Sequence, residues 1–325
     1  MASSALKTYL PAQADARAIS MGLPFIRGKW FFVDPLSGAS TNDGLTVETA
    51  MDNISTAYTA CTDGAGDGIA VLSRVVSSTT TSSLLTAAIT WSKNGITVFG
   101  VAAKSGYNSR ARIANATALT NAPVLITVSG TNNHFENIYL INEGTDNAAI
   151  GCLVVTGARN SFVNCHFSQN GGTRTPQATD NDMTISSSEC TFERCFFGNN
   201  NTIRSGAAAG NIILGVSTTQ MGQNYFRECV ILSYSATSTH GAIKIANAAT
   251  LGGYVTFDGC QFINWNSGAE TAIATIVIGA TPNNMGILLN RCASAGYAAI
   301  SADAFTVSTG PTAGAGTGPI AQGVA

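Results

Sequence analysis

The sequence predicts an all-β solenoid, in which short parallel strands stack coil upon coil. Three observations support this fold class. A short motif recurs through the second half of the 325-residue chain, each copy follows a partner strand, and no unit carries a convincing helix between its strands. Without helices a βαβ arrangement fits poorly, whereas strands and turns that repeat by themselves fit the coils of a parallel β-solenoid.

The motif is a large apolar residue, two variable residues, a cysteine, one variable residue and a second, mostly large apolar residue. Self-similarity at a period near 30 residues is stronger evidence than any single-residue motif. The clear copies are Phe162-x-x-Cys165-x-Phe167, Phe192-x-x-Cys195-x-Phe197, Phe226-x-x-Cys229-x-Ile231 and Phe257-x-x-Cys260-x-Phe262, with weaker copies at Phe135-x-x-Ile138-x-Leu140 and Leu289-x-x-Cys292-x-Ser294.

Each copy follows a partner strand, so one unit consists of a strand, a turn, a bent strand and a loop. Three short strands and three tight turns need roughly 20–25 residues, and the excess in each unit is predicted to bulge from one side. The partner strands are predicted at 125–128, 152–155, 183–185, 211–214, 242–245 and 274–278.

The apolar and cysteine positions are predicted to form two inward columns, one aromatic and one of thiols. Five of the eight cysteines share the motif position. A buried free cysteine behaves as a small hydrophobe, so we interpret them as a reduced column rather than as disulfides or a metal site. This core ladder contains Phe162, Cys165, Phe192, Cys195, Phe226, Cys229, Phe257 and Cys260.

The composition agrees with a solenoid and excludes some function classes. Only 10% of the residues are charged, far below the roughly 25% of ordinary soluble domains. The net charge of −2 predicts no binding to nucleic acid or to a membrane surface. The N-terminus lacks the apolar core of a signal peptide, and no apolar run reaches transmembrane length. We therefore expect the protein to fold in a cytoplasm.

The chain divides into four predicted parts: an arm (1–28), a first strand with a capping helix (29–64), the solenoid (65–300) and a Gly/Ala-rich tail (301–325). The arm either packs on a neighbouring subunit or folds back on its own solenoid. The helix is predicted to begin after Thr46 as N-cap, with Glu48 in its first turn and Gly64 beyond its end. A helix placed there would cover the exposed edge of the first coil.

Residues 31–61 resemble the opening segment of pectate-lyase-like right-handed parallel β-helix proteins, which is common in bacteriophage tailspikes and related virion proteins. The resemblance implies a right-handed single-stranded parallel β-helix with an N-terminal capping α-helix, and trimers are usual in that family. It indicates fold more than function, because this scaffold carries lyases, hydrolases and inert structural proteins. The matching residues are Val33, Asp34, Gly38, Asn42, Asp43, Gly44, Leu45, Glu48, Thr49 and Ala50.

Few residues offer chemistry for cleaving a polysaccharide, which would need paired carboxylates or calcium-binding acids with a base. If the protein is an enzyme, the catalytic candidates are Asp180, Asp182, Glu193 and Asp258. Our main interpretation of Glu193 and Asp258 is structural, because Arg227 stands between them in the stack and the alternating signs favour charge pairing. The three histidines show no ligand spacing, and neither a metal site nor a cofactor is predicted.

One outward column holds large side chains at the position after each cysteine. Its members Tyr139, His166, Phe196 and Val230 are candidates for a homotrimer interface, because exposed apolar patches usually mark interfaces. The alternative is that a loop of the same chain folds over the column.

The resemblance, together with the scarcity of paired carboxylates, implies a structural bacteriophage virion protein without enzymatic activity, most specifically a trimeric capsid decoration (cement) protein. It would lie on the capsid surface, bound to the major capsid protein or another virion component, after assembly in the host cytoplasm. The alternative is a tailspike-like protein that binds or depolymerises a host surface polysaccharide, with that glycan as its partner.

Overall fold

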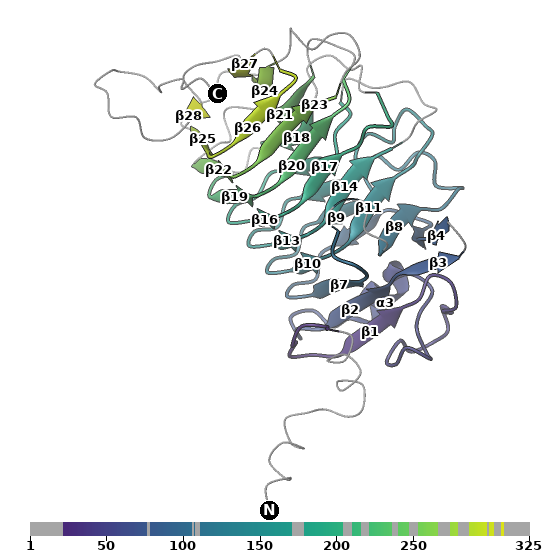
Figure 1. Cartoon of the computed structure of the whole chain (residues 1–325). Coiled ribbons are helices and arrows are strands. Elements are labelled where there is room, and N and C mark those ends of the chain that lie inside the picture. Colours follow the sequence, from purple (N-terminus) through teal and green to yellow (C-terminus); the bar gives the residue numbers. More distant parts are fainter. Residues whose placement is uncertain are drawn as a thin grey trace, which may run out of the picture.

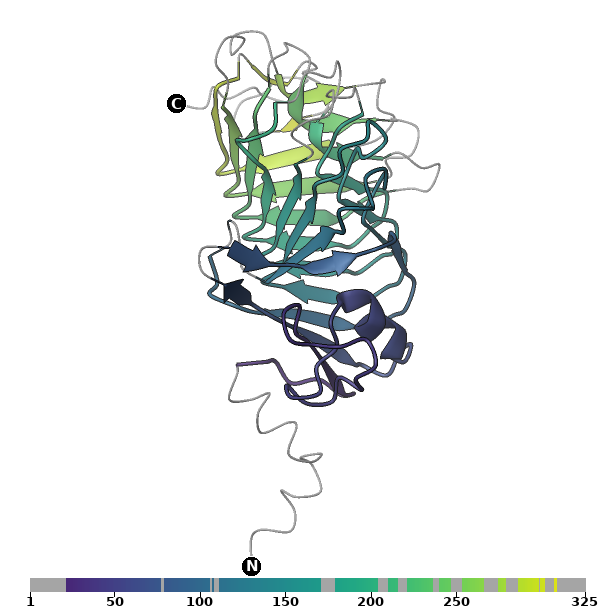
Figure 2. The same cartoon turned by 90° about the vertical axis from the view of Figure 1, so that its right-hand side faces the viewer.

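The computed structural model is a stack of parallel coils whose strands form three long sheets along one axis (Figure 1). In Figure 2 the colours run from purple at one end of the stack to yellow at the other, so the coils stack in chain order. This confirms the predicted right-handed parallel β-helix. The structure describes residues 22–76, 79–105, 107, 111–170, 179–203, 210–215, 221–235, 240–246, 253–265, 274–278, 286–297, 299–301 and 307–308.

Each complete coil contributes one strand to each sheet, and equivalent strands of successive coils pair in parallel. Sheet 1 contains β1 (Trp30–Val33), β2 (Gly68–Leu72), β7 (Thr97–Val101), β10 (His134–Glu136), β13 (Ser161–Val163), β16 (Thr191–Glu193), β19 (Asn224–Arg227), β22 (Tyr254–Asp258), β25 (Gly286–Asn290) and β28 (Val307–Ser308). Sheet 2 contains β5 (Ser83–Leu85), β8 (Arg112–Asn115), β11 (Tyr139–Asn142), β14 (His166–Gln169), β17 (Phe196–Gly198), β20 (Val230–Ser233), β23 (Gln261–Asn264) and β26 (Ala293–Ala295).

Sheet 3 is formed by the strands that precede each motif, where the sequence predicts them. They are β6 (Ile89–Trp91), β9 (Ile126–Val128), β12 (Leu153–Val155), β15 (Met183–Ile185), β18 (Gly210–Leu214), β21 (Gly241–Ile245), β24 (Ala274–Ile278) and β27 (Ala299–Ser301). A separate antiparallel hairpin joins β3 (Arg74–Val76) to β4 (Thr79–Thr81).

A tight turn between sheet 1 and sheet 2 explains the spacing inside the motif. The residue before each cysteine position has a left-handed backbone, which bends the chain so that the residues on either side face the same core. Glycine adopts this conformation without strain and asparagine tolerates it, whereas other residues pay a steric cost. The turn residues are Asn137 (φ 58°), Asn164 (φ 51°), Arg194 (φ 50°), Glu228 (φ 52°), Gly259 (φ 65°) and Arg291 (φ 53°).

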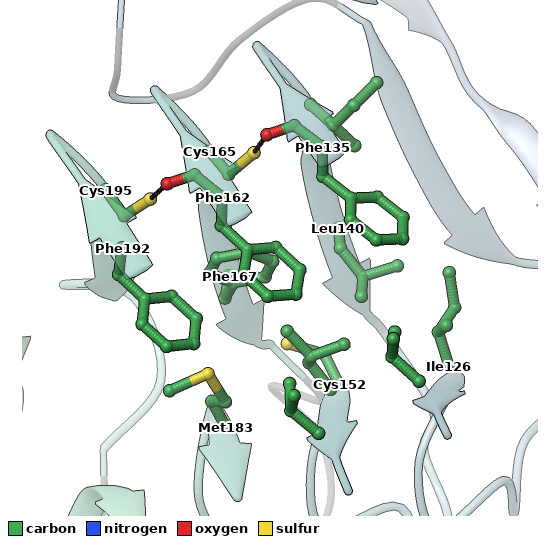
Figure 3. Close-up of a cluster of buried hydrophobic side chains, with 14 of the residues drawn as sticks. Ile126, Phe135, Leu140, Cys152, Phe162, Cys165, Phe167, Met183, Phe192 and Cys195 are labelled. Carbon is green, nitrogen blue, oxygen red and sulfur yellow. Dashed lines mark hydrogen bonds between the residues drawn. The ribbon is translucent and has the colours of Figure 1, made fainter. Parts of the chain in front are cut away.

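The eight core-ladder residues are buried, each at most 1% exposed. Phenylalanine rings of successive coils stack with centroids 4.6–5.0 Å apart. Each thiol donates to a carbonyl of the preceding coil, as Cys165 does to Phe135 at 3.4 Å (Figure 3). All eight cysteines are free, and burial raises the pKa of Cys195, which keeps its thiol protonated and unreactive.

A further inner column consists of asparagines at the turn before sheet 1, and the sequence did not predict it. The Asn133 side chain accepts a hydrogen bond from the Ile96 N–H at 2.9 Å, and Asn160 accepts one from the Asn133 N–H at 2.9 Å. Asn224 repeats the bond to the Cys190 N–H. These amides satisfy buried backbone donors that the turn leaves without a strand partner.

Helix α3 (Ile54–Ala60) lies at the N-terminal end of the stack but is shorter than predicted (Figure 1). Thr46 is not its N-cap, and Glu48 precedes the helix; the cap is Asn53, whose side chain accepts a bond from a backbone N–H of the first turn. The cause is Met51, which forms a parallel bridge with Val33. Backbone held in a β bridge cannot also be helical, so the helix starts only after it.

The helix packs its apolar side against the first coils. Ile54 and Ala57 are fully buried, and the ring of Tyr58 stacks on Trp91 with centroids 4.2 Å apart. Both aromatic residues belong to the main hydrophobic core. The end of the core is therefore covered by this chain's own side chains.

The segment that carries the family resemblance is a loop held by Asp34. Its carboxylate accepts bonds from the backbone N–H groups of Leu36 and Ser37 and pairs with Arg74. A Cβ at Gly38 would lie 2.2 Å from the Met51 carbonyl oxygen, so only glycine fits there. These matching residues serve local packing, which is why the resemblance reports fold rather than activity.

The two predicted terminal segments are described only in part. Leu23, near the end of the arm, is buried against Trp30, and Arg27 donates to the Gly64 and Ala65 carbonyls. Residues 1–21 and 309–325 lie outside the described residues, so the course of the arm and of the tail stays a prediction.

We expect Phe192→Ala to lower the free energy of unfolding by about 3–5 kcal/mol, because it removes one ring from a fully buried stack and leaves a cavity. Thr191→Ala, on the outer face of the same strand, is the matched control and should change it by less than about 0.5 kcal/mol. Urea denaturation followed by circular dichroism measures both. Equal effects of the two substitutions would contradict the assignment of the column to the core.

Candidate functional site

The outer face of sheet 1 carries two rows of polar side chains, which alternate with the buried phenylalanines along each strand. In-register pairing aligns Ser161, Thr191, Tyr225 and Thr256, which we call the hydroxyl row. The same pairing aligns Glu193, Arg227 and Asp258, which we call the charged row. Neighbouring strands lie about 4.8 Å apart, so both rows present a regular series of groups along the solenoid axis.

Asp258 is the centre of a hydrogen-bonded cluster at the junction of β22 and β25. It accepts a bond from the Tyr225 hydroxyl (2.8 Å), one from Asn290 Nδ2 (2.9 Å) and two from the Arg291 guanidinium (3.0 and 2.9 Å). These donors, Tyr225 first and Arg291 next, hold the pKa of Asp258 below its ordinary value. The same bond raises the pKa of Tyr225.

This arrangement assigns a positioning role to Asp258. A carboxylate offers about four lone-pair sites, and four donors occupy them. With its pKa lowered, Asp258 has no proton to give as a general acid. It instead orients the Tyr225 hydroxyl and the Arg291 guanidinium, whose side chain is 68% exposed and free to meet a ligand on this face.

Tyr254 is an exposed aromatic ring at the other end of β22, four residues before Asp258. Its side chain is on the outer face of β22, two residues before Thr256, and is 69% exposed. A Cβ built at Gly286, opposite it in β25, would lie 2.9 Å and 3.0 Å from two carbons of the ring. The ring therefore lies over the bare backbone of Gly286, which supports it from one side and leaves the rest open.

The charged row stands in the register that its alternating signs favour, but its ion pairs differ from those predicted. Glu193 pairs with Arg194, and Arg227 lies 3.7 Å from Glu228. Arg194 and Glu228 are left-handed turn residues that directly follow the row, so they reach its charges from the same coil. Glu193 and Arg227 are therefore paired within their own coils, whereas Asp258 pairs with Arg291 of the next coil.

Asp180 and Asp182 lie inside the protein, near the junction of sheets 2 and 3. They are 2% and 0% exposed. Asp182 accepts bonds from the Gln169 N–H at 2.9 Å and from Asn211 Nδ2 at 2.6 Å. A ligand in solvent cannot reach these carboxylates, and Asp182 ties neighbouring coils together. Both are therefore removed from the catalytic candidates, and Glu193 and Asp258 are the two on the outer face.

The predicted trimer residues lie on the outer face of sheet 2, but two of them are covered by their own chain. Tyr139 and His166 stack with centroids 4.1 Å apart and are 5% and 1% exposed. Tyr107 packs on His166 and Phe196 at 5.1 Å and 4.6 Å. Tyr139 and His166 are therefore covered by a loop of the same chain, which was the alternative to a trimer interface. Phe196 and Val230 are half-buried, so a trimer built on them stays a prediction.

In the described part of the chain, Glu136 and His240 lie away from the Asp258 cluster. His134 and Lys104 lower the pKa of Glu136 to about 2 on the outer face of sheet 1. His240 Nε2 lies 3.3 Å from Asn211 in the interior. Among the described residues, no group of three or more His, Cys, Asp or Glu side chains could hold a metal ion. In the same part of the chain, no helix has the length and apolar character needed to cross a membrane.

Tyr225, Tyr254, Asn290 and Arg291 were not among the predicted site residues. Tyr225 occupies the position before the first phenylalanine of its motif, where other coils have Ser161 and Thr191. Strict alternation turns this position outward, so a search of the outward positions for aromatic residues would have found it. Tyr254 has no equivalent in the other motifs, and the repeat therefore gave no signal for it.

Comparison with known proteins supports the fold. No protein-family model matches the chain, and no curated protein matches it. Two structures of a pectin methylesterase from Aspergillus niger each have a TM-score of 0.52 and 14% identity. The match to the penultimately deglycosylated form covers 88% of this chain and 91% of the enzyme's chain. The match to the deglycosylated form covers 90% of this chain and 94% of the enzyme's chain. Pectate lyase Pel9A matches with a TM-score of 0.43 and 14% identity over 91% of this chain and 83% of its own.

These matches correct one expectation from the sequence. We predicted a structural protein without enzymatic activity, but the solved structures that share the fold are pectin methylesterases. Sharing the fold with these enzymes removes the ground for expecting an inert protein. At 14% identity the likeness shows the fold alone, and it does not identify a substrate.

Buried His166 predicts a loss of stability in mild acid. Burial lowers its pKa to about 4, and its Nε2 lies 2.8 Å from the Gly198 carbonyl oxygen. Between pH 6.5 and about 4 the unfolded chain binds a proton at this residue and the folded protein does not, so stability falls as the pH falls through this range. Between pH 7 and pH 4.5 the expected loss is about 2.5 kcal/mol, because one unit of difference in pKa is worth about 1.4 kcal/mol.

Urea denaturation at pH 7 and pH 4.5 measures this loss. His166→Phe keeps an aromatic ring against Tyr139 and removes the titrating group, so most of the difference between the two pH values should disappear. The carboxylates with lowered pKa, such as Asp258, lose their contribution only at lower pH, which separates the two effects. An unchanged pH difference in His166→Phe would show that another group is responsible.

Proposed function

We propose that this protein is a carbohydrate-active β-helix protein that binds an extended polysaccharide on the outer face of sheet 1. The observation that carries the proposal is the exposed Tyr254 ring on the same strand as Asp258, which holds Tyr225 and Arg291. This develops the polysaccharide alternative of the sequence analysis. The matches to pectin methylesterases support it through the fold, since pectin is a polysaccharide.

The chemistry of a sugar fits this arrangement. A pyranose ring has faces of C–H groups and a rim of hydroxyls, so its binding site needs an apolar plate with polar groups at its edge. Tyr254 offers such a plate, 69% exposed. Four residues further along the same strand, Asp258 holds Tyr225 and Arg291 at 2.8–3.0 Å, so the next part of an extended polysaccharide would meet oriented polar groups that lose little side-chain entropy on binding.

A capsid location, a capsid partner and a homotrimer stay predictions from the resemblance. Half-buried Phe196 and Val230 on sheet 2 are the residues on which the trimer would depend. Sedimentation equilibrium of the full chain tests the oligomeric state, and Val230→Asp should dissociate a trimer built on this face.

We expect Tyr254→Ala to weaken binding to the cognate polysaccharide about 10-fold, corresponding to about 1.4 kcal/mol, because it removes the plate. Trp265→Ala is the matched control, since Trp265 is a comparably exposed aromatic (64%) next to sheet 2. Affinity electrophoresis in gels that contain host surface polysaccharides measures both. A larger loss in Trp265→Ala would move the site to the other face.

Glu193 is our candidate acid–base group, because Asp180 and Asp182 are buried and the four sites of Asp258 are occupied. Its side chain is 26% exposed on the same face. We expect Glu193→Gln to lower the release of reducing ends from the bound polysaccharide on the order of 100-fold, with binding retained. Unchanged release in this variant would place the chemistry elsewhere, whereas the Tyr254 result would still decide where the polysaccharide binds.

A further inference from the structure

The ionic groups of the candidate site occur as matched pairs. On the outer face of sheet 1 and its two flanking turns, five basic side chains each lie within 4 Å of a carboxylate. Lys104 pairs with Glu136 at 2.6 Å, and Arg291 with Asp258 at 2.9 Å. In the described part of this face, positive and negative charges of these pairs therefore cancel.

The remaining pairs lie at the two edges of the face. Arg159 and Glu189 pair at 2.6 Å in the turn before sheet 1. At the other edge Arg194 pairs with Glu193, and Arg227 lies 3.7 Å from Glu228. Only the last pair is loose. The cations of these three pairs thus also lie close to carboxylates.

This pairing disfavours an anionic polymer. A uronate or sulfate group that approached one of these cations would also approach the paired carboxylate, and the repulsion would offset the attraction. The net charge of −2 for the whole chain offers no long-range attraction either. A surface that binds acidic polysaccharide needs cations in excess. Besides the five pairs, the turn before β7 contains Lys93, but its Nζ donates to the Tyr58, Thr59 and Cys61 carbonyls and is held against helix α3.

The hydroxyl row offers the opposite kind of recognition. Ser161, Thr191, Tyr225 and Thr256 stand in register on four successive strands and are half-buried. A hydroxyl both donates and accepts hydrogen bonds, which matches the hydroxyls of a sugar without requiring charge. Tyr254 lies at one end of this row, on the same strand as Thr256.

We propose that the ligand is a neutral polysaccharide, whose chain runs along the hydroxyl row and ends its contact on Tyr254. This inference rests on the proposed function, since it names the class of polysaccharide for the same face. It also assigns Thr191 and Thr256, which neither the sequence nor the fold matches single out, as residues that determine specificity.

The test compares neutral with acidic polysaccharides. The full chain is run by affinity electrophoresis against dextran, galactomannan and mixed-linkage β-glucan, and against polygalacturonate and alginate. We expect at least one neutral polymer to bind 10-fold more tightly than either acidic polymer, with no loss in about 0.5 M sodium chloride, which screens ionic contacts. The double variant Thr191→Val and Thr256→Val should weaken that binding at least 10-fold.

A variant with fewer carboxylates tests whether the paired charges exclude acidic polysaccharides. Glu189→Gln with Glu228→Gln leaves Arg159 and Arg227 without their carboxylates, and should create salt-sensitive binding to polygalacturonate. Salt-sensitive binding of the unmodified chain to the acidic polymers alone would overturn the neutral class but leave the proposed function standing. Neutral binding that survives the double valine variant would overturn the role of the hydroxyl row. Binding to no polysaccharide at all would overturn the proposed function itself.

Discussion

The in-register parallel pairing of successive coils is the constraint on which the rest of this structure depends. Because Phe162 stands directly above Phe192, and Phe192 above Phe226, any residue type kept at one position becomes a column. Inside the coil such a column must fill the same space at every level, which explains the stacked rings at 4.6–5.0 Å. The thiols and the buried asparagines obey the same rule at the two turns that flank sheet 1.

The left-handed turn between sheets 1 and 2 connects this constraint to the surface. Its φ values of 50–65° would favour asparagine or glycine at every level, yet Arg194, Glu228 and Arg291 occupy three levels. Each of these residues carries a steric cost and each forms an ion pair with the outer face of sheet 1. At these positions the backbone favours glycine, but the chain has charged residues. Their charges neutralise the opposite charges on the outer face of sheet 1, to which we assign a ligand.

The core was predictable because its buried columns repeat from coil to coil. The candidate site does not repeat, so periodicity could not predict it. Phe192 and Cys195 have equivalents in every clear motif, so their inward direction followed from periodicity. The helix start failed because Thr46 and Asn53 are both good caps, and only the bridge of Met51 to Val33 decides between them. The burial of His166 depends on Tyr107, which is far away in the sequence, and no local pattern reports such a contact.

The same reasoning locates function in a solenoid of this kind. A column that must be filled alike at each level leaves no room for a residue that acts only once, so a site has to lie where a column breaks. Tyr254 is such a break: its partner in the next strand is Gly286, which has no side chain to hold the column, and the ring covers the space. Asp258 is a second break in a column, since its carboxylate accepts hydrogen bonds from Tyr225 of the preceding coil and Arg291 of the following coil. The two breaks fall on one strand, β22, and the hydroxyl row leads to it from the regular part of the stack.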